Sequence, residues 1–247
     1  MTRVIAFYAV ILICNIIHGI TGFAGTILAM PPSLMLVGYD VAKPILNVLA
    51  ILSGLYVLVG NIRKVDWKEL AKVVVIMMLG IFGAVYIRHW FVGRESLLYK
   101  LLGIFVIALA VNGCLGLTRT EKEETEETQR NGIKNYAVLV LAGIIHGLFV
   151  SGGPLLVGYL TRQIRNTDAF RATISTIWVF LNALILLDDV RAGLWTQSTI
   201  ITGLISVPFL LGGMYIGSRL YAKMSRMFFM RLTYILLFIS GITLLVK

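Results

Sequence analysis

Charged residues are scarce in this chain of 247 residues. They make up 14% of the sequence, while 58% of residues are hydrophobic; a soluble domain has about 25% charged residues. Cysteine is nearly absent, and Cys14 and Cys114 stand singly in apolar runs, which excludes a disulfide framework or a cysteine-based metal site. We expect both thiols to be buried by packing. The net charge is +10, but the basic residues form no stripe, which excludes a nucleic-acid partner.

Several catalytic and nucleotide-binding motifs are also missing. The sequence has no G-x-x-x-x-G-K-[ST] loop to cradle ATP phosphates. It has neither G-x-S-x-G nor H-E-x-x-H. An enzyme is therefore not expected, and an intramembrane enzyme that uses Ser151 and His146 is kept only as a minor alternative. No cofactor and no metal ion are predicted.

Long apolar runs dominate what is present. A run of roughly 20 apolar residues is long enough to span a bilayer as a helix. Such runs lie near 4–37, 44–62, 69–92, 97–117, 135–160, 171–187, 198–218 and 227–246. They predict an all-α polytopic membrane protein with the lipid bilayer as its surroundings. The first run is too long for the apolar part of a cleavable signal peptide, so none is expected.

One short phrase occurs twice, 128 residues apart. Ile16-Ile17-His18-Gly19 is matched by Ile144-Ile145-His146-Gly147. More matches follow at the same spacing: Gly25 with Gly153, Asp40 with Asp168, Lys43 with Arg171, Arg63 with Arg191 and Trp67 with Trp195. They predict two homologous repeats, 1–117 and 135–247, joined by a hydrophilic acidic linker at 118–134. Repeats in a membrane protein are typical of transporters, whose site lies where the copies meet.

The first apolar run of each repeat is unusual. Residues 4–37 would form a helix of about 50 Å, whereas a bilayer core is about 30 Å thick. Glycines in the middle and Pro31-Pro32 after them favour a break. The second repeat is predicted to break at Ser151-Gly152-Gly153-Pro154. We expect each repeat to start with a glycine-broken helix or re-entrant hairpin, followed by three transmembrane helices.

The basic residues in the loops predict an orientation. If each first run doubles back, the loops near 61–72, 118–134, 160–171 and 218–231 share one side and hold 15 of the 22 Lys and Arg residues. If the first run crossed once, the basic residues would divide almost evenly. The positive-inside rule then places the 15 in the cytoplasm and both termini outside. Under this arrangement the two repeats have inverted topology.

The two glycine-rich breaks are the predicted substrate site. A helix that begins inside the membrane exposes unpaired N–H groups and the positive end of its dipole, and both attract anions. The candidate residues are the histidines, glycines and hydroxyl residues of the two breaks: His18, Gly19, Thr21, Gly22, Gly25, Thr26, His146, Gly147, Ser151, Gly152 and Gly153. Close helix packing is the alternative role for the glycines. A structural hydrogen bond is the alternative for the histidines, which are also candidates for proton relay.

Polar residues on the following helix of each repeat complete the candidate set. Lys43 and Arg171 each follow an aspartate by three residues, and Asp40 and Asp168 suit an N-cap or a first helical turn. The two cations either extend to the membrane interface or attract an anion.

Deeper in the same apolar runs lie Asn47 and Asn182. They either line a path or bond between helices. At the end of the later run, Asp188, Asp189 and Arg191 are expected at the membrane interface.

At these motifs the chain resembles the TauE/SafE sulfite-exporter family, also called the toluene-sulfonate uptake permeases. The matching stretches are Gly19-x-x-Gly22-Phe23-Ala24-Gly25 with Pro31, and Gly152-Gly153-Pro154-Leu155-Leu156-Val157-Gly158-Tyr159-Leu160 followed by Phe170-Arg171-Ala172-Thr173. The resemblance covers nearly the whole chain. It implies transport of sulfite, organosulfonates and related small anions across the bacterial inner membrane. The chain departs from the family at Thr26 and at Val150-Ser151.

Together these features predict a secondary transporter for a small sulfur-containing anion that works by alternating access. Proton coupling through the histidines is a hypothesis. Transport of another small anion, such as a carboxylate, is the alternative, because a helix N-terminus binds carboxylates as readily as sulfonates. The sequence indicates no oligomeric state.

Overall fold

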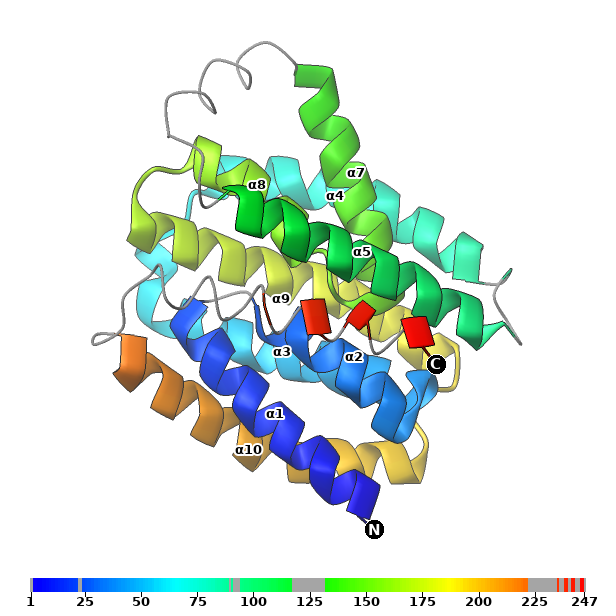
Figure 1. The fold of residues 1–247 in the computed structure, drawn as a ribbon. Helices are drawn as coiled ribbons and strands as arrows, with labels where there is room; N and C mark the ends of the chain where they lie inside the picture. Colours follow the sequence, from blue (N-terminus) through cyan, green and yellow to red (C-terminus); the bar gives the residue numbers. More distant parts are fainter. Residues whose placement is uncertain are drawn as a thin grey trace.

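A computed structural model describes residues 2–21, 24–88, 90, 94–116 and 132–221, with short pieces between 235 and 246. All regular secondary structure in these ranges is helical (Figure 1). The helices are α1 (Thr2–Thr21), α2 (Gly25–Val37), α3 (Tyr39–Asn61), the short 3-10 helix η1 (Ile62–Lys64), α4 (Trp67–Arg88), α5 (Glu95–Gly116), α7 (Gly132–Phe149), α8 (Gly153–Gln163), α9 (Thr167–Arg191) and α10 (Gln197–Tyr221). The predicted linker at 118–134 lies almost wholly outside the described residues.

Five of these helices are long and apolar enough to cross a membrane, namely α1, α3 with η1, α4, α9 and α10. Their spans have a mean hydropathy between 1.7 and 2.3. The prediction of an all-α, multi-pass membrane protein is confirmed.

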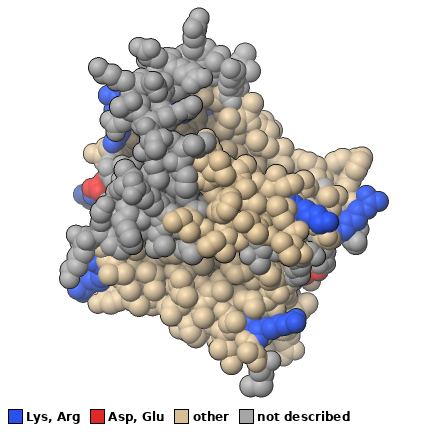
Figure 2. All heavy atoms as spheres, in the orientation of Figure 1, with Lys and Arg blue, Asp and Glu red and all other residues tan. Residues whose placement is uncertain are grey.

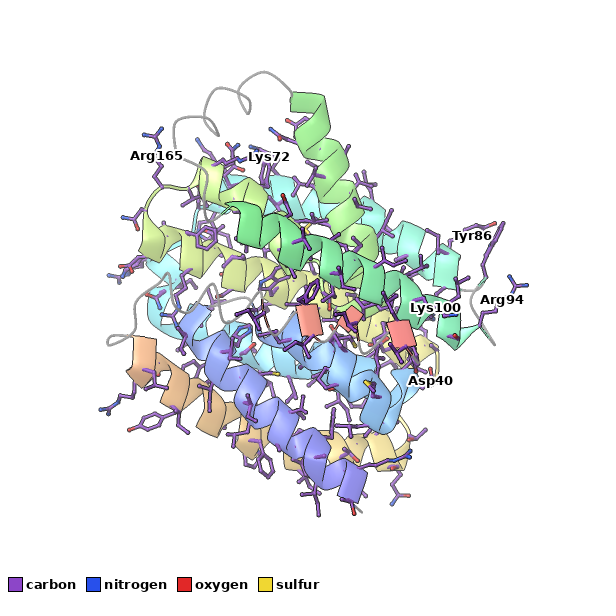
Figure 3. The ribbon with its side chains drawn as sticks, in the orientation of Figure 1. Asp40, Lys72, Tyr86, Arg94, Lys100 and Arg165 are labelled. Carbon is purple, nitrogen blue, oxygen red and sulfur yellow. The ribbon has the colours of Figure 1, made fainter. Side chains whose placement is uncertain are left out.

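The outer surface is apolar and the interior holds polar groups. On α4, Val75, Leu79, Phe82 and Tyr86 form an outward stripe and are each more than 60% exposed. Figure 2 shows a broad uncharged surface, with Lys and Arg side chains toward its margins. In Figure 3 the labelled ionic side chains lie at two opposite ends of the helices, with Lys72 and Arg165 at one and Arg94, Lys100 and Asp40 at the other. Lipid contact explains this distribution.

Both predicted breaks are present. The first lies between Thr21 and Gly25, and the second lies between Phe149 and Gly153. At the first break α2 folds back against α1, because Gly25 lies beside the Cys14 carbonyl and the His18 side chain. Figure 1 shows α2 returning along α1 toward the start of α3. Pro31-Pro32, predicted near the break, lie inside α2.

Helix boundaries recur at the spacing seen in the sequence. The ends of α1 and α7, the starts of α2 and α8, and the starts of α3 and α9 are each 128 residues apart. The packing of the helices follows the same correspondence, in which α1 matches α7, α4 matches α10 and α3 matches α9. Thus α1 packs along α10, α7 packs along α4, and α3 packs along α9.

The α3–α9 pair forms the centre of the bundle and is antiparallel. Contacts along it join rising residue numbers in α3 and η1 to falling numbers in α9: Lys43 with Asp189, Asn47 with Asn182, Gly54 with Ser175, and Lys64 with Asp168. Glycine permits the close crossing, since a Cβ on Gly54 would lie 2.8 Å from the Ser175 carbonyl oxygen.

Candidate functional site

A small cavity lies where the two broken helices meet. Its lining comes from α1, α2, α3, α9 and the segment from α7 to α8, and consists of His18, Thr26, Ile27, Ala50, His146, Val150, Ser151, Gly153, Trp178 and Asn182. Its volume of about 10 Å³ is enough for roughly one water molecule. An oxyanion is larger than this, so its walls must separate before one can enter.

The cavity sits midway along the two central helices. Ala50 is equally far from Tyr39 and Asn61, the ends of α3, and Trp178 lies near the middle of α9. If α3 and α9 cross the bilayer, the cavity therefore lies near its midplane.

The start of each second half-helix faces this cavity. Thr26 and Ile27 lie in the first turn of α2, and Gly153 is the first residue of α8. The first N–H groups of α2, before Leu28, and of α8, before Leu156, have no hydrogen-bond acceptor within their own helix. Leu28 donates to the Ala24 carbonyl, and Leu156 donates to that of Gly152. The positive ends of both helix dipoles thus lie at one place.

The ends of the preceding half-helices are capped from across the bundle. The Tyr39 hydroxyl donates to the Leu148 carbonyl at 2.7 Å, near the end of α7. Arg171 donates from Nη2 to the Gly19 carbonyl at 3.1 Å, near the end of α1. These donors come from the first residue of α3 and from the second turn of α9. They occupy carbonyl oxygens near the negative ends of the α7 and α1 dipoles.

The second break also holds an unusual backbone conformation. Val150 has φ of 53°, in the left-handed region that β-branched residues rarely adopt. Its N–H donates to the His146 carbonyl at 2.7 Å. The residue 128 positions earlier is Gly22, a type that adopts this region without penalty. Strain of this kind is often found at functional sites.

His146 and Asn182 place buried polar atoms at the cavity. Both are buried, at 2% and 0% exposure. They lie beside each other, yet neither imidazole nitrogen and neither amide atom of Asn182 forms a hydrogen bond of normal geometry. Trp178 packs against the imidazole, with ring centroids 4.8 Å apart. By contrast, the Ser151 hydroxyl donates to the Phe149 carbonyl at 2.8 Å.

Several predicted glycines pack helices together and do not line the cavity. A Cβ on Gly19 would lie 2.9 Å from the Met214 carbonyl oxygen of α10. Gly147 similarly faces Ala84 of α4 at 2.6 Å. Gly25 and Gly152 let each second half-helix approach the histidine of its first half. These contacts match the packing alternative, while they also fix where α2 and α8 begin.

Lys43 lies away from the cavity lining, in a buried ionic cluster. Its ammonium is fully buried and hydrogen-bonded to Asp189, which is also fully buried. Asp188 lies 3.8 Å from the same ammonium, and its carboxylate accepts from Arg88 Nη1 at 2.6 Å. The Lys43 side chain therefore does not extend to the protein surface, and Asp189 lies in the last turn of α9 but inside the protein. Neither residue reaches the surface, because each is the other's buried counter-ion.

Other predicted residues have structural contacts. Asn47 donates to the Asn182 backbone carbonyl at 3.1 Å and joins α3 to α9. Asp40 and Asp168 lie in first helical turns, as expected. The residues at the N-cap positions are Gly38 and Asn166, and the Asn166 side chain accepts from the Ala169 N–H. Gly22 and the side chains of Thr21 and Cys114 lie outside the described part of the chain.

Sequence reasoning missed four residues of the cavity lining: Ile27, Ala50, Val150 and Trp178. Trp178 has one usable indication, since it lies one turn from Asn182 on the same face of α9. Ile27 and Ala50 are ordinary apolar residues in apolar runs, and nothing in the sequence distinguishes them. Val150 stands where the first repeat has Gly22.

Comparisons with known proteins agree on one family. The family model described as "Sulfite exporter TauE/SafE" matches residues 7–244. A relative from Comamonas testosteroni, "Probable inner membrane transporter protein TsaS", is 23% identical over 185 residues, covering 74% of each chain. No solved structure shows a significant match.

Proposed function

The chain belongs to the sulfite exporter TauE/SafE family of membrane transporters, and from this premise we propose that it carries sulfite or a small organosulfonate across the inner membrane. The family places it among transporters and not enzymes. The relative from Comamonas testosteroni, named as an inner membrane transporter, supports that location.

One observation carries the proposal: the second halves of both broken helices, α2 and α8, start at the same buried cavity. Thr26 of α2 and Gly153 of α8 lie on its wall together with His18 and His146. Two helix N-termini and polar side chains hold an anion without a formal charge at the site. Asn182 adds an amide donor whose hydrogens form no other bond of normal geometry. A sulfonate or sulfite oxygen accepts from such groups.

Two inverted repeats explain this convergence. The recurring helix boundaries and the exchanged helix pairs support residues 1–117 and 135–247 as copies. A two-fold axis that exchanges α3 with α9 must be perpendicular to both, because these two helices are antiparallel. If they span the bilayer, the axis lies in the membrane plane, as in other inverted-repeat transporters.

The charge distribution gives the proposed orientation. Lys72 and Arg165 lie at the end where α3 and α8 finish (Figure 3). The loops assigned to that end hold 15 of the 22 basic residues. The positive-inside rule assigns it to the cytoplasm. The start of α1 and the cluster around Lys43 then face the outside.

Alternating access follows from the small size of the cavity. About 10 Å³ holds roughly one water molecule and no oxyanion. The described conformation is therefore closed around the site, and transport requires the walls to open toward each side in turn. Proton coupling through His18 and His146 is part of the proposal. Unchanged pH dependence of transport after both are replaced by Gln would remove that part.

Binding to the purified full chain tests the function most directly. We would measure the melting temperature in detergent with sulfite, thiosulfate, methanesulfonate or acetate. A ligand that binds the folded state raises this temperature by mass action. We expect sulfite and methanesulfonate to raise it and Asn182→Leu to abolish the rise. The matched control is Asn61→Leu, because among the described residues Asn61 bonds only within its own helix, to the Val57 carbonyl.

Each other result has a definite meaning. A rise with acetate alone would replace the sulfur anion with a carboxylate as the substrate. A rise that Asn182→Leu leaves unchanged would move the site away from this cavity. If no anion changes the melting temperature and proteoliposomes take up none of them, the proposed function is wrong.

A further inference from the structure

The cavity wall carries hydrogen-bond donors and no formal charge. Its described lining includes no Lys, Arg, Asp or Glu. The polar side chains there are His18, Thr26, His146, Ser151 and Asn182. On the cavity wall itself, only dipoles stabilise a bound anion. Cations outside the wall can add to this, so their contribution has to be considered.

The nearest buried lysine contributes little to that field. Lys43 stands in a cluster with Asp189, Asp188 and Arg88, so two cations are matched by two carboxylates. Asp189 follows Asn182 by two helical turns of α9, about 10 Å along the helix axis. At that distance a neutral cluster acts only as a weak multipole.

Arg171 is directed at a peptide carbonyl. Its guanidinium donates to the Gly19 oxygen near the end of α1, where the helix dipole is negative. The full charge of the guanidinium exceeds the half charge of that helix end, and the negative end of α7 balances the remaining half. The matching negative end of α7 is capped by the neutral hydroxyl of Tyr39, which donates to the Leu148 carbonyl.

What remains at the cavity is the positive end of α2 and that of α8. Each helix N-terminus is equivalent to roughly half a positive charge, so the two together match about one negative charge. The polar side chains of His146 and Asn182 support a ligand in the cavity, since both are almost fully buried and neither completes a hydrogen bond of normal geometry. While both histidines are neutral, a second negative charge has no counterpart on the wall.

The cost of dehydration makes this difference decisive. By Born solvation the cost of removing an ion from water rises with the square of its charge, so a dianion loses roughly four times as much hydration free energy as a monoanion of the same size. Helix dipoles that compensate the dehydration of one negative charge do not compensate the additional hydration free energy that a dianion loses.

Given the proposed function, we propose that this site selects singly charged oxyanions, such as sulfonates and protonated sulfite, over dianions of the same size and shape. Methanesulfonate and sulfate form the sharpest pair of probes. Both are tetrahedral at sulfur, each with five heavy atoms, and they differ by one unit of charge.

The test is uptake of labelled methanesulfonate or sulfate by proteoliposomes that contain the full chain. We expect methanesulfonate uptake to be faster by roughly tenfold or more, a ratio set by the second charge. Equal rates, or faster sulfate uptake, would overturn the inference and leave the proposed function standing. No uptake of methanesulfonate, sulfate or sulfite would contradict the proposed function itself.

A charge variant provides a second test on the same vesicles. Asp189→Asn removes one carboxylate from the cluster and leaves Lys43 with excess positive charge near the site. We expect the ratio of sulfate to methanesulfonate uptake to rise severalfold. Asp168→Asn is the control, because it removes the partner of the exposed Lys64. The inference fails if both variants change the ratio equally.

Sulfite itself supplies a test that needs no variant. Its protonated form is a monoanion, and it loses a proton near neutral pH to become a dianion. Sulfite uptake should fall as pH rises through that range, while methanesulfonate uptake, which reports any titration of the protein, should not follow it. Parallel pH profiles for the two substrates would overturn the inference.

Discussion

The two ends of the central α3–α9 pair occupy matching positions but differ in how their charges are held. At one end Lys43 and Asp189 are both fully buried, and Asp188 extends the cluster to Arg88 of α4. At the other end the ion pair of Lys64 and Asp168 is exposed, at 49% and 68% of the two side chains. The residue 128 positions before Asp189 is Asn61, so the second end lacks the buried acid.

This difference teaches which end is harder to open. Separating a buried ion pair leaves each charge without its counter-ion in a low-dielectric interior. The two members of an exposed pair separate into water at little cost. The Lys43 end also joins three helices, α3, α4 and α9. We infer that the described conformation is sealed more tightly at this end than at the Lys64 end.

The largest expected effect is that of Asp189→Ala. The variant leaves the Lys43 ammonium buried without its closest counter-ion, a change that typically costs about 3–5 kcal/mol. Chemical unfolding of the purified protein in detergent would measure the loss. The double variant Lys43→Met with Asp189→Leu should recover most of it, because both charges are then gone. A single variant as stable as the parent would contradict the buried pair.

A smaller loss is expected where the two helices cross. In Gly54→Ala the new methyl group would lie 2.8 Å from both the Ser175 carbonyl oxygen and a Val179 methyl carbon. Overpacking of this kind costs about 1–3 kcal/mol. Gly60→Ala on the same helix is the matched control, since nothing lies within 4 Å of its new Cβ. If the two variants unfold at the same denaturant concentration, the helices do not cross this closely.

The cap on α7 should contribute less again. Tyr39→Phe removes the hydroxyl that donates to the buried Leu148 carbonyl, at a cost of about 1 kcal/mol. Tyr86→Phe is the control, because Tyr86 is 69% exposed on the outer face of α4. Tyr39→Phe should also lower anion affinity, since the freed Leu148 carbonyl adds negative potential near the cavity. An affinity unchanged beside a measurable stability loss would make the cap purely structural.

Local patterns in the sequence predicted the breaks and much of the cavity. Glycines near Gly25 and Gly153 cannot sustain a long helix without cost, and the structure breaks next to both. His18 and His146 line one cavity, as their matched positions suggested. The prediction needed only helix length, glycine content and spacing. Each of these is readable within a single segment of the chain.

Long-range pairing was the part that the sequence did not give. Lys43 and Asp189 are 146 residues apart, and each alone resembles a charged residue at the end of an apolar run. Their burial follows from the antiparallel crossing of α3 and α9, which no local pattern encodes. Trp178 became part of the cavity for the same reason, because its neighbour His146 comes from another helix.

The smallest expected effect completes the comparison at the exposed end. Lys64→Gln removes a pair whose ammonium and carboxylate lie 2.6 Å apart in water, where side-chain entropy and ionic screening cancel most of the attraction. Its unfolding curve should overlay that of the parent. If this end opens first, the variant should also transport at least as fast as the parent, because one tether between η1 and α9 is gone. A loss of stability like that of Asp189→Ala would mean that the two ends are sealed equally, and the assignment of the weaker end would fall.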